Sequence, residues 1–306
     1  MRQTHFISFI TVNYNGVAET LALIDSIYSC FFSHADELKG LEFEIVVVDN
    51  KSDRDELHII KNRYPEVIAI QSPHNFGFAA GNNLGFAKSV GDYVFFINND
   101  VQLRDDSVKY LVERLQSSQS TAGASPKILS SKNGKTIQFA GFTKLSKITM
   151  RNKIIGLDEV DIGQYDQPGR TPYIHGAAVI VKREVINKVG GWPEDFFLYY
   201  EELDWSTKIT NAGYELWYEP KCTVYHSGSA SIGVNSPVQV FYMTRNRMLY
   251  AVKNFHRFAA CLSVIYQWFI AVPKQCFKFI IKRKFNLVAV SLRACYNFRR
   301  GGKINL

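Results

Sequence analysis

The chain has 306 residues and a mass of 34.9 kDa, which is enough for one large domain or two modest ones. With 46% hydrophobic and 21% charged residues, it has the composition of a folded globular protein, which argues against disordered, collagen-like and multi-pass membrane classes. Five scattered cysteines without a Cys-x-x-Cys pair exclude a zinc ribbon and argue against a disulfide scaffold. We therefore expect a reduced, cytoplasmic setting, and residues 1–5 lack a signal-peptide pattern.

The net charge of +8 divides unevenly along the chain. Residues 1–219 carry 22 Lys and Arg against 28 Asp and Glu, whereas residues 220–306 carry 14 Lys and Arg and no acid. An acidic body thus bears a strongly basic tail. Within this tail, residues 258–272 form an uncharged, aromatic-rich run that we expect Pro273 to end, and basic residues follow.

The composition of this tail predicts its partner. A membrane span needs about 20 apolar residues, and the uncharged run has fifteen. Aromatic side chains interleaved with Lys and Arg favour instead an amphipathic helical tail, residues 256–306, that lies on the anionic inner face of the cell membrane as a peripheral attachment. A core helix with a solvated basic face is the alternative, and nucleic acid is disfavoured because no binding motif accompanies the charge.

Strand-like and helix-like segments alternate along the first hundred or so residues. This alternation predicts an α/β fold with an open, mostly parallel sheet flanked by helices and with ligands at the carboxyl ends of the strands. The expected strands are 6–13, 43–49, 67–71 and 93–98, and the expected helices are 18–32, 53–64, 78–89 and 105–117. Residues 130–166 predict a polar excursion with short strands, followed by a strand at 173–181, a helix at 201–211 and a strand at 222–225.

Polar residues follow three of these strands and favour a nucleotide site. Tyr14, Asp49 and Asp100 come directly after the first, second and fourth strands. An aromatic ring can stack on a base, one carboxylate can accept base or ribose hydrogens, and another can hold the divalent cation that a diphosphate requires. Each feature alone is a common turn or cap. The run 75–85 adds a small-residue helix start where backbone can approach a ligand, but it lacks the spacing of a dinucleotide-binding fingerprint.

Three acids lie at the start of the helix at 201–211. Glu201, Glu202 and Asp204 follow an aromatic run, and a carboxylate beside apolar surface can be tuned as a base. Helix capping and solubility are the alternative. On a helix Glu201 and Asp204 share a face and Glu202 points about 100° away. His226 after a strand is structural or a ligand, and Arg245 either binds phosphate or caps a surface helix.

Six motifs of the chain occur together and in a fixed order. They are TVNYNG (11–16), VVVDNKS (46–52), NFGFAAGNN (75–83), FINND (96–100), GGWPEDFFLYYEELDW (190–205) and Tyr225-His226. In these motifs the chain resembles the inverting family 2 glycosyltransferases of the A-type fold, in particular their rhamnosyltransferase-like branch. The resemblance spans about residues 6–250 and implies a nucleotide-diphospho-sugar transferase fold. It implies a catalytic domain at 1–255, with a nucleotide-binding half (1–120) and an acceptor-binding half (121–255), before the basic tail.

The resemblance also implies an activity: transfer of rhamnose or a related hexose from a dTDP- or UDP-linked donor to a hydroxyl of a glycan acceptor, expected to be lipid-linked, in cell-surface polysaccharide synthesis. It implies Mg²⁺ or Mn²⁺ as cofactor, although Asn98 replaces the first carboxylate of the family's Asp-x-Asp element. Glu202 matches the general base, with Glu201 or Asp204 as substitutes. The other implied contacts are Val12, Asn13, Tyr14, Asn15, Asp49, Asn75, Gly77, Asn83, Asn99 and Asp100 for the nucleotide sugar, Gly191, Trp192 and Arg245 for the acceptor, and Asp100 and His226 for the metal.

Other functional classes stay open at this point. A protein that binds nucleotide sugars without turnover would keep Tyr14, Asp49 and Asp100 but tolerate loss of Glu202. A membrane-attached scaffold would need only the tail. A nucleotidyltransferase would need a basic glycine-rich phosphate loop near the N-terminus, and TVNYNG has no Lys or Arg.

Overall fold

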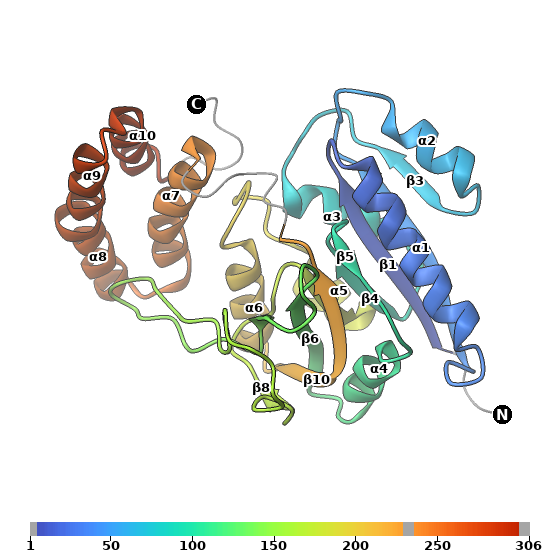
Figure 1. Cartoon of the computed structure of the whole chain (residues 1–306). Helices are drawn as coiled ribbons and strands as arrows, with labels where there is room; N and C mark the ends of the chain where they lie inside the picture. Colours follow the sequence, from blue (N-terminus) through green and yellow to red (C-terminus); the bar gives the residue numbers. More distant parts are fainter. Residues whose placement is uncertain (1–4, 229–235, 300–306) are drawn as a thin grey trace.

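A computed structural model describes residues 5–228 and 236–299, in which a ten-stranded mixed sheet crosses the molecule (Figure 1). The strand order is β3-β2-β1-β4-β9-β6-β10-β5, with β7 beside β6 and β8 beside β10. The pairs β1–β2, β1–β4, β2–β3 and β6–β10 are parallel, and β9 is antiparallel to both its neighbours. The strands are β1 (His5–Asn13), β2 (Leu41–Asp49), β3 (Ile68–Gln71), β4 (Tyr93–Ile97), β5 (Val101–Gln102), β6 (Thr121–Ser130), β7 (Ile137–Phe139), β8 (Gly169–Arg170), β9 (Ala178–Lys182) and β10 (Glu215–His226).

Helices cover both faces of this sheet, so the predicted α/β class with a central sheet flanked by helices is confirmed. The sheet is mixed, and β1, β2, β3, β4, β6 and β10 run in one direction. Alternate side chains of β1 point to opposite faces, as a pleated strand requires: Ile7 and Phe9 join the core beneath α1 and α4, and Ile10 joins the core beneath α3, α5 and α6. The helices are α1 (Val17–Ser33), α2 (Glu56–Arg63), α3 (Phe78–Phe86), α4 (Val108–Gln116), α5 (Arg183–Val189), α6 (Glu201–Asn211), α7 (Pro237–Asn254), α8 (Arg257–Tyr266), α9 (Val272–Ile281) and α10 (Phe285–Tyr296).

Most of the predicted elements are present, but the second half of the sheet was underestimated. The sequence pattern predicts no strand where β6 lies and predicts only the last residues of β10. The strand predicted at 173–181 begins too early, because β9 begins at Ala178. Pro126 lies inside β6, and opposite it β10 carries three extra residues, so that Glu219 pairs with Pro126 and Thr223 with Lys127. Because proline enters sheets at edges and bulges, this central bulged strand has no recognisable strand pattern.

The carboxyl ends of several strands meet at one edge of the sheet. Asn13 pairs with Asp49 at the ends of β1 and β2, and the turn after β4 leads to β5, whose Val101 pairs with His226 at the end of β10. The turn that contains Asp100 therefore connects the end of β4 with the end of β10. This topology brings the residues after β1, β2, β4 and β10 to the same edge, as the sequence predicts.

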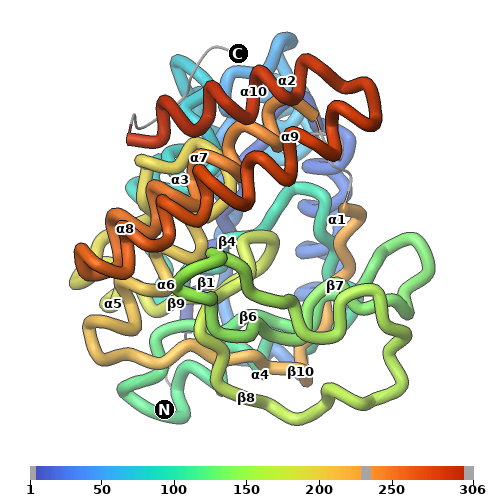
Figure 2. The backbone as a smooth tube through the Cα atoms, turned by 90° about the vertical axis from the view of Figure 1, so that its left-hand side faces the viewer, coloured from blue at the N-terminus to red at the C-terminus, as the bar shows by residue number. Residues whose placement is uncertain are grey.

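Helices α8, α9 and α10 form a layer outside the sheet-covering helices, with α7 beneath them (Figures 1 and 2). Met248 of α7 packs with Val272 and Cys276 of α9 and Cys295 of α10. Figure 2 shows α8 and α9 as one rod across this face, with α10 beside it. The last part of the predicted tail, 300–306, and the start, 1–4, lie outside the described residues.

The expectation that Pro273 ends the apolar helix is wrong. The chain stays helical from α8 into α9 through a π-helical segment, Gln267–Ala271. Proline lacks an N–H and crowds the carbonyl four residues earlier, and a π-helical turn before it relieves both constraints. The helix therefore carries the lysines that follow Pro273 on the same rod as the apolar run. Among the described helices, none is both long and apolar enough to cross a membrane.

Candidate active site

A buried polar network joins the ends of β1, β2 and β3. Asn13 donates from Nδ2 to Asp49 Oδ2 at 2.8 Å and to Glu56 Oε2 at 2.8 Å. Asp49 also accepts from the Ser52 N–H at 2.9 Å and from Gln71 Nε2 at 2.8 Å. Burial acts to raise the pKa of Asp49, but these hydrogen bonds outweigh it and lower that pKa below its ordinary value. Asp49 is therefore an ionised anchor that fixes the loops around the predicted nucleotide site.

Tyr14 and Asn15 lie in the loop that this network holds. Tyr14 is 43% exposed, so its ring is open for stacking. Asn15 has a positive φ of 52° and exchanges two hydrogen bonds with Asp53, from Nδ2 to the carboxylate and from the Asp53 N–H to Oδ1. Val12, one residue before Asn13, is half-buried beneath α3, where a Cβ on Gly81 would lie 2.9 Å from it.

Gly77 joins the two halves of the chain. Its φ is +92°, and a Cβ at this position would lie 2.3 Å from the carbonyl oxygen of Phe197, so only glycine fits without a shift. Asn50 donates from Nδ2 to Asn75 Oδ1 and to the Gly77 carbonyl, both at 3.1 Å, which fixes this approach. The loop before α6 is thereby held against the start of α3, at the same edge as the strand ends.

A second contact between α3 and the loop before α6 lies nearby. It involves three residues that the resemblance implies as ligand contacts, Asn83, Gly191 and Trp192. Asn83 accepts from the Trp192 N–H at 2.8 Å and donates to the Trp192 carbonyl at 2.9 Å. A Cβ on Gly191 would lie 2.4 Å from Asn83 Oδ1. Trp192 is buried and packs edge-on against Phe78 and Phe96. In this structure these residues hold the 190–195 loop and do not point their polar groups at solvent.

Asp100 and His226 form a pair, and Gln138 orients the histidine ring. Gln138 donates from Nε2 to the His226 carbonyl at 3.1 Å, so its Oε1 is the atom that faces His226 Nδ1 at 2.7 Å. Nδ1 therefore donates to Gln138, and Nε2 faces Asp100 Oδ1 at 3.1 Å. Asp100 Oδ2 accepts from Ser227 Oγ at 2.9 Å. Burial and then the nearby His226 lower the pKa of His175 to about 3, so His175 is a neutral neighbour.

This pair suits a divalent cation. An imidazole nitrogen and a carboxylate oxygen side by side are ligands that Mn²⁺ accepts, and a hydrogen bond on the other ring nitrogen is the usual support of a histidine ligand. No cluster of three or more His, Cys, Asp or Glu side chains arranged for a metal occurs in the part of the chain that the structure describes. A cation at Asp100 and His226 therefore needs oxygens from a bound phosphate or water, as is usual for Mg²⁺. Asn99 instead donates to the Gly16 carbonyl at 3.2 Å and to Thr20.

The acidic helix α6 starts from a strained turn. Tyr199 and Tyr200 both have positive φ, 67° and 77°, which for non-glycine residues costs on the order of 1–3 kcal/mol each. The Tyr200 hydroxyl donates to the Met150 carbonyl at 2.8 Å and is fixed in place. Such strain is typical of functional sites. Here it turns the chain directly into Glu201 and Glu202.

The three acids have different surroundings, as the helix geometry predicts. Glu201 and Asp204 are buried on one face, and Glu202 is half-buried on another. Asp204 accepts from Asn254 Nδ2 at 2.6 Å and pairs with Lys253 Nζ at 2.9 Å, so its charge is compensated. Burial raises the pKa of Glu202 to about 7, although its own N–H and that of Tyr200 act to lower it.

Glu201 completes the pair with Glu202. Burial and then the charge of Glu202 raise the pKa of Glu201 well above its ordinary value. Its Oε2 is buried without a hydrogen-bond partner among the described residues. Both carboxyl groups therefore favour the protonated form more than an ordinary glutamate does, and Glu202, the half-buried one, can exchange a proton near pH 7.

Arg245 lies in the interior of the protein and not at the surface, where a phosphate ligand or the cap of a surface helix would lie. It is fully buried, and its guanidinium donates to the Asp195 carbonyl and to Asn246 Oδ1, both at 2.9 Å. Asn246 in turn donates to the carbonyls of Leu198 and Tyr199. In this structure Arg245 thus supports the loop that precedes α6.

Several residues of the site were not identified from the sequence. Gln138 sits in the segment interpreted as a polar excursion, and nothing in its spacing links it to His226. Tyr199 and Tyr200 were interpreted as apolar context for the acids, because positive φ has no sequence signal at tyrosine. Ser227, beside His226 in sequence, could have been suspected as a partner of Asp100 from the shared edge of the sheet.

Comparisons with known proteins bear on the family of the chain. A family model described as "Glycosyl transferase family 2" matches residues 8–190. The dTDP-rhamnosyl transferase RfbF of Shigella flexneri is 26% identical over 232 residues, which cover 71% of this chain and 74% of that protein. An N-acetylglucosaminyl-diphospho-decaprenol L-rhamnosyltransferase of Mycobacterium tuberculosis is 24% identical over 216 residues, 62% of this chain and 68% of the relative.

Other comparisons bear on length and fold. A pre-mycofactocin glycosyltransferase of Mycobacterium tuberculosis is 27% identical over 193 residues, but these cover 62% of this chain and only 38% of that protein. Among solved structures, a mannosyltransferase from Pyrobaculum calidifontis in complex with GDP-Man and Mn²⁺ matches with a TM-score of 0.55 and 16% identity, over 95% of this chain and 74% of that one. The A-type fold implied by the motifs is therefore confirmed.

Proposed function

Since the chain belongs to glycosyl transferase family 2, we propose that it is an inverting hexosyltransferase that moves rhamnose or a related hexose from a dTDP- or UDP-linked donor to a hydroxyl of a glycan acceptor. The acceptor is lipid-linked, and the product is a cell-surface polysaccharide or its precursor. Two relatives named as rhamnosyltransferases support the sugar, and the diphospho-decaprenol substrate in the name of one of them supports the acceptor class.

The observation that carries this proposal is the Glu202 carboxylate at the strained turn before α6. With a pKa of about 7 and a half-buried position, Glu202 can take the proton from an acceptor hydroxyl as that oxygen attacks the anomeric carbon. One displacement from the side opposite the leaving group inverts the configuration. Glu201 is buried and its pKa is raised well above the ordinary value, so Glu202 is the more accessible base.

The donor's nucleoside diphosphate belongs at the shared edge of the sheet. Tyr14 stacks on the base, and the Asp49 network holds the loop that presents it. Asp100 and His226 would hold Mg²⁺ or Mn²⁺, and the cation would neutralise charge on the leaving diphosphate. Asn83, Gly191 and Trp192 keep the loop beside the acids in position.

We place the enzyme on the cytoplasmic face of the cell membrane, attached through the helical tail at 256–306. Apolar side chains on the outer side of α8 and α9 are exposed at helical spacing, and lysines flank them, which is the pattern of an interfacial helix. The most exposed are Phe258, Phe269, Phe277 and Ile281, at 68%, 75%, 64% and 66%.

A donor panel tests the proposed activity. The full-length protein is incubated with dTDP-rhamnose and a set of UDP- and GDP-hexoses, with and without Mn²⁺, and is scored for thermal stabilisation and for release of nucleoside diphosphate. We expect one nucleotide class to stabilise the protein in the presence of the cation and to be turned over. Stabilisation without any release or transfer would favour the alternative, a binding protein without turnover.

A further inference from the structure

A basic cavity lies between α7 and α9, on the tail side of the acidic turn. It has a volume of about 530 Å³, and its lining includes no acidic residue among the described side chains. Residues 220–306, which supply nearly all of the lining, contain no acid at all. We call this cavity the basic groove and define it by its six cations, Arg151, Arg247, Lys274, Lys278, Lys282 and Lys284.

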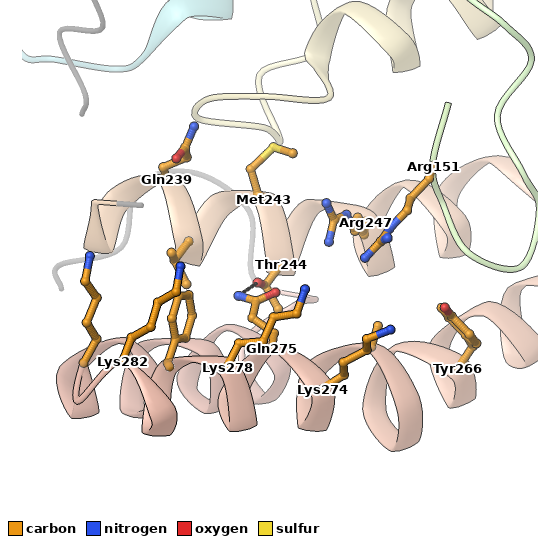
Figure 3. Close-up of a pocket in the computed structure, with 14 residues that line it drawn as sticks. Arg151, Gln239, Met243, Thr244, Arg247, Tyr266, Lys274, Gln275, Lys278 and Lys282 are labelled. Carbon is orange, nitrogen blue, oxygen red and sulfur yellow. Dashed lines mark hydrogen bonds between the residues drawn. The ribbon is translucent and has the colours of Figure 1, made fainter. Parts of the chain in front are cut away.

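The cations converge from several segments (Figure 3). Lys274 and Lys278 of α9, and Lys282 directly after it, rise toward α7, while Arg151 comes from the loop between β7 and β8 and points toward Arg247 of α7. The three lysines are spaced by four residues, so they lie on one helix face, where like charges destabilise a helix by about 0.2–0.5 kcal/mol per pair. No acid of the tail offsets this repulsion. A bound polyanion would offset it.

The basic groove reaches the turn that carries the proposed base. Arg247 donates from Nε to the Tyr200 hydroxyl at 3.4 Å, and Tyr200 directly precedes Glu201. Gln239, which also lines the basic groove, hydrogen-bonds Tyr199. An anion held by Arg247 would therefore lie next to the residues that position Glu202.

We propose that the basic groove binds the diphosphate of a lipid-linked acceptor and thereby presents the acceptor sugar to Glu202, an inference that rests on the proposed function. Two guanidinium groups match phosphate oxygens by paired hydrogen bonds. From Lys274 to Lys282 the stripe spans about 12 Å along the helix, longer than one phosphate needs. The exposed apolar side chains of Phe277 and Ile281 on the same helix would keep the lipid chain in the membrane.

Binding of inorganic pyrophosphate by titration calorimetry tests this site. The full-length protein is used in buffer with a chelator, so that the metal-dependent donor site does not contribute. We expect Lys274→Gln/Lys278→Gln to weaken binding by about tenfold or more, because two cations of the site are lost. Arg151→Gln, on a different segment, should weaken it as well. The matched control, Arg257→Gln/Arg299→Gln, removes two charges from the same tail outside the basic groove and should change affinity by less than about twofold.

The outcomes separate the possible sources of phosphate. No binding to the wild type, or an equal loss in the control, would overturn the proposal. The second arm measures binding of the same variants to phosphatidylcholine vesicles with and without phosphatidylglycerol. We expect Lys274→Gln/Lys278→Gln and the control to lose the same fraction of vesicle binding. If Lys274→Gln/Lys278→Gln lost more vesicle binding than the control but kept its pyrophosphate binding, the basic groove would be a site for bilayer headgroups, and the proposal would be overturned as well. Failure of the proposed function would appear separately, as no nucleotide release from any donor.

Discussion

Glu201 and Glu202 are neighbours in sequence that lie in different surroundings: Glu201 is buried with a pKa raised well above its ordinary value, and Glu202 is half-buried with a pKa of about 7. We expect Glu202→Gln to lower the transfer rate by about 10²–10⁴ because the amide cannot accept the proton. Donor binding should stay within about threefold, since the role that we propose for Glu202 is at the acceptor hydroxyl and not at the nucleotide. The measurement is single-turnover transfer beside nucleotide titration. Glu184→Gln, in the first turn of α5, is the control, and retained transfer in Glu202→Gln would move the base to another residue.

The raised pKa of Glu202 also predicts a pH dependence of stability. In the unfolded chain this carboxyl titrates near 4.5, and in the folded protein near 7, so between these values the folded state binds more protons. The free energy of unfolding contributed by this group therefore falls as pH rises through that window, by an amount on the order of 1–3 kcal/mol. Urea unfolding at several pH values should show a steeper decline in the wild type than in Glu202→Gln. Parallel curves would contradict the assignment.

Gln138 orients the ring of His226 and is predicted to act as a positioning residue for the cation. Gln138→Leu removes the acceptor of the Nδ1 hydrogen bond and frees the ring. We expect the apparent affinity for Mn²⁺, measured by metal-dependent thermal stabilisation with nucleotide present, to fall by about tenfold. Gln102→Leu, on the strand beside His226, is the control and should leave that affinity unchanged.

The acids and strand-end residues could be predicted at this scale, but their partners could not. Tyr14, Asp49 and Asp100 follow strands directly, so sequence position alone places them at one edge. The spacing of Glu201, Glu202 and Asp204 predicts which of them faces away from the core. The Gln138–His226 contact joins residues 88 positions apart in the chain. It could not be predicted, because Gln138 lies in a segment whose sequence has no strong periodicity and therefore does not indicate where the segment packs.

At the scale of elements, the contact between the start of α3 and the loop before α6 holds the site together. Gly77→Ala would place a methyl group 2.3 Å from the Phe197 carbonyl oxygen at a φ of +92°. We expect a loss of at least about 2 kcal/mol in unfolding free energy, together with weaker turnover, because the acidic turn shifts.

The control for this substitution is Gly169→Ala, where no atom lies within 4 Å of the added Cβ. Its stability should stay within about 0.5 kcal/mol of the wild type. Chemical denaturation of both variants measures the difference. Equal stability of the two variants would mean that the Gly77 contact does not constrain the loop.

The first half of the sheet follows from sequence because its strands are apolar β-branched runs separated by amphipathic helices. In the second half, β6 carries Pro126 and Lys127 in a buried central strand, and its partner β10 has three extra residues opposite them. Lys127 is tolerated there because it pairs with Asp161 at 2.9 Å. Such local compensation cannot be inferred from single-residue preferences.

At the scale of the whole molecule, the division into an acidic body and a basic tail was evident from sequence, but the course of the tail was not. Because the helix continues through Pro273, α8 and α9 present the apolar face and the lysines of the basic groove on one rod. The proposed membrane contact and the proposed phosphate contact thus belong to one rod, whose lysines point toward α7 (Figure 3).

This arrangement predicts how the protein binds bilayers. Phe269→Ser/Phe277→Ser should reduce binding to phosphatidylglycerol-containing vesicles by about tenfold or more, since each phenylalanine buries apolar area in the interface. Phe32→Ser/Ile162→Ser removes side chains that are 74% and 82% exposed outside the tail and is the matched control. Vesicle sedimentation measures both. Equal binding of the two variants would mean that the tail does not enter the bilayer surface.

The central claim is that strand-end residues and the start of α6 act on one activated sugar. A crystal structure of Glu202→Gln with a nucleoside-diphosphate sugar and Mn²⁺ tests it most directly. We predict the base on Tyr14, the cation between Asp100 and His226, and residue 202 facing the anomeric carbon from the side opposite the diphosphate. A donor bound elsewhere, or an anomeric carbon closed off from residue 202 by intervening protein, would contradict the account.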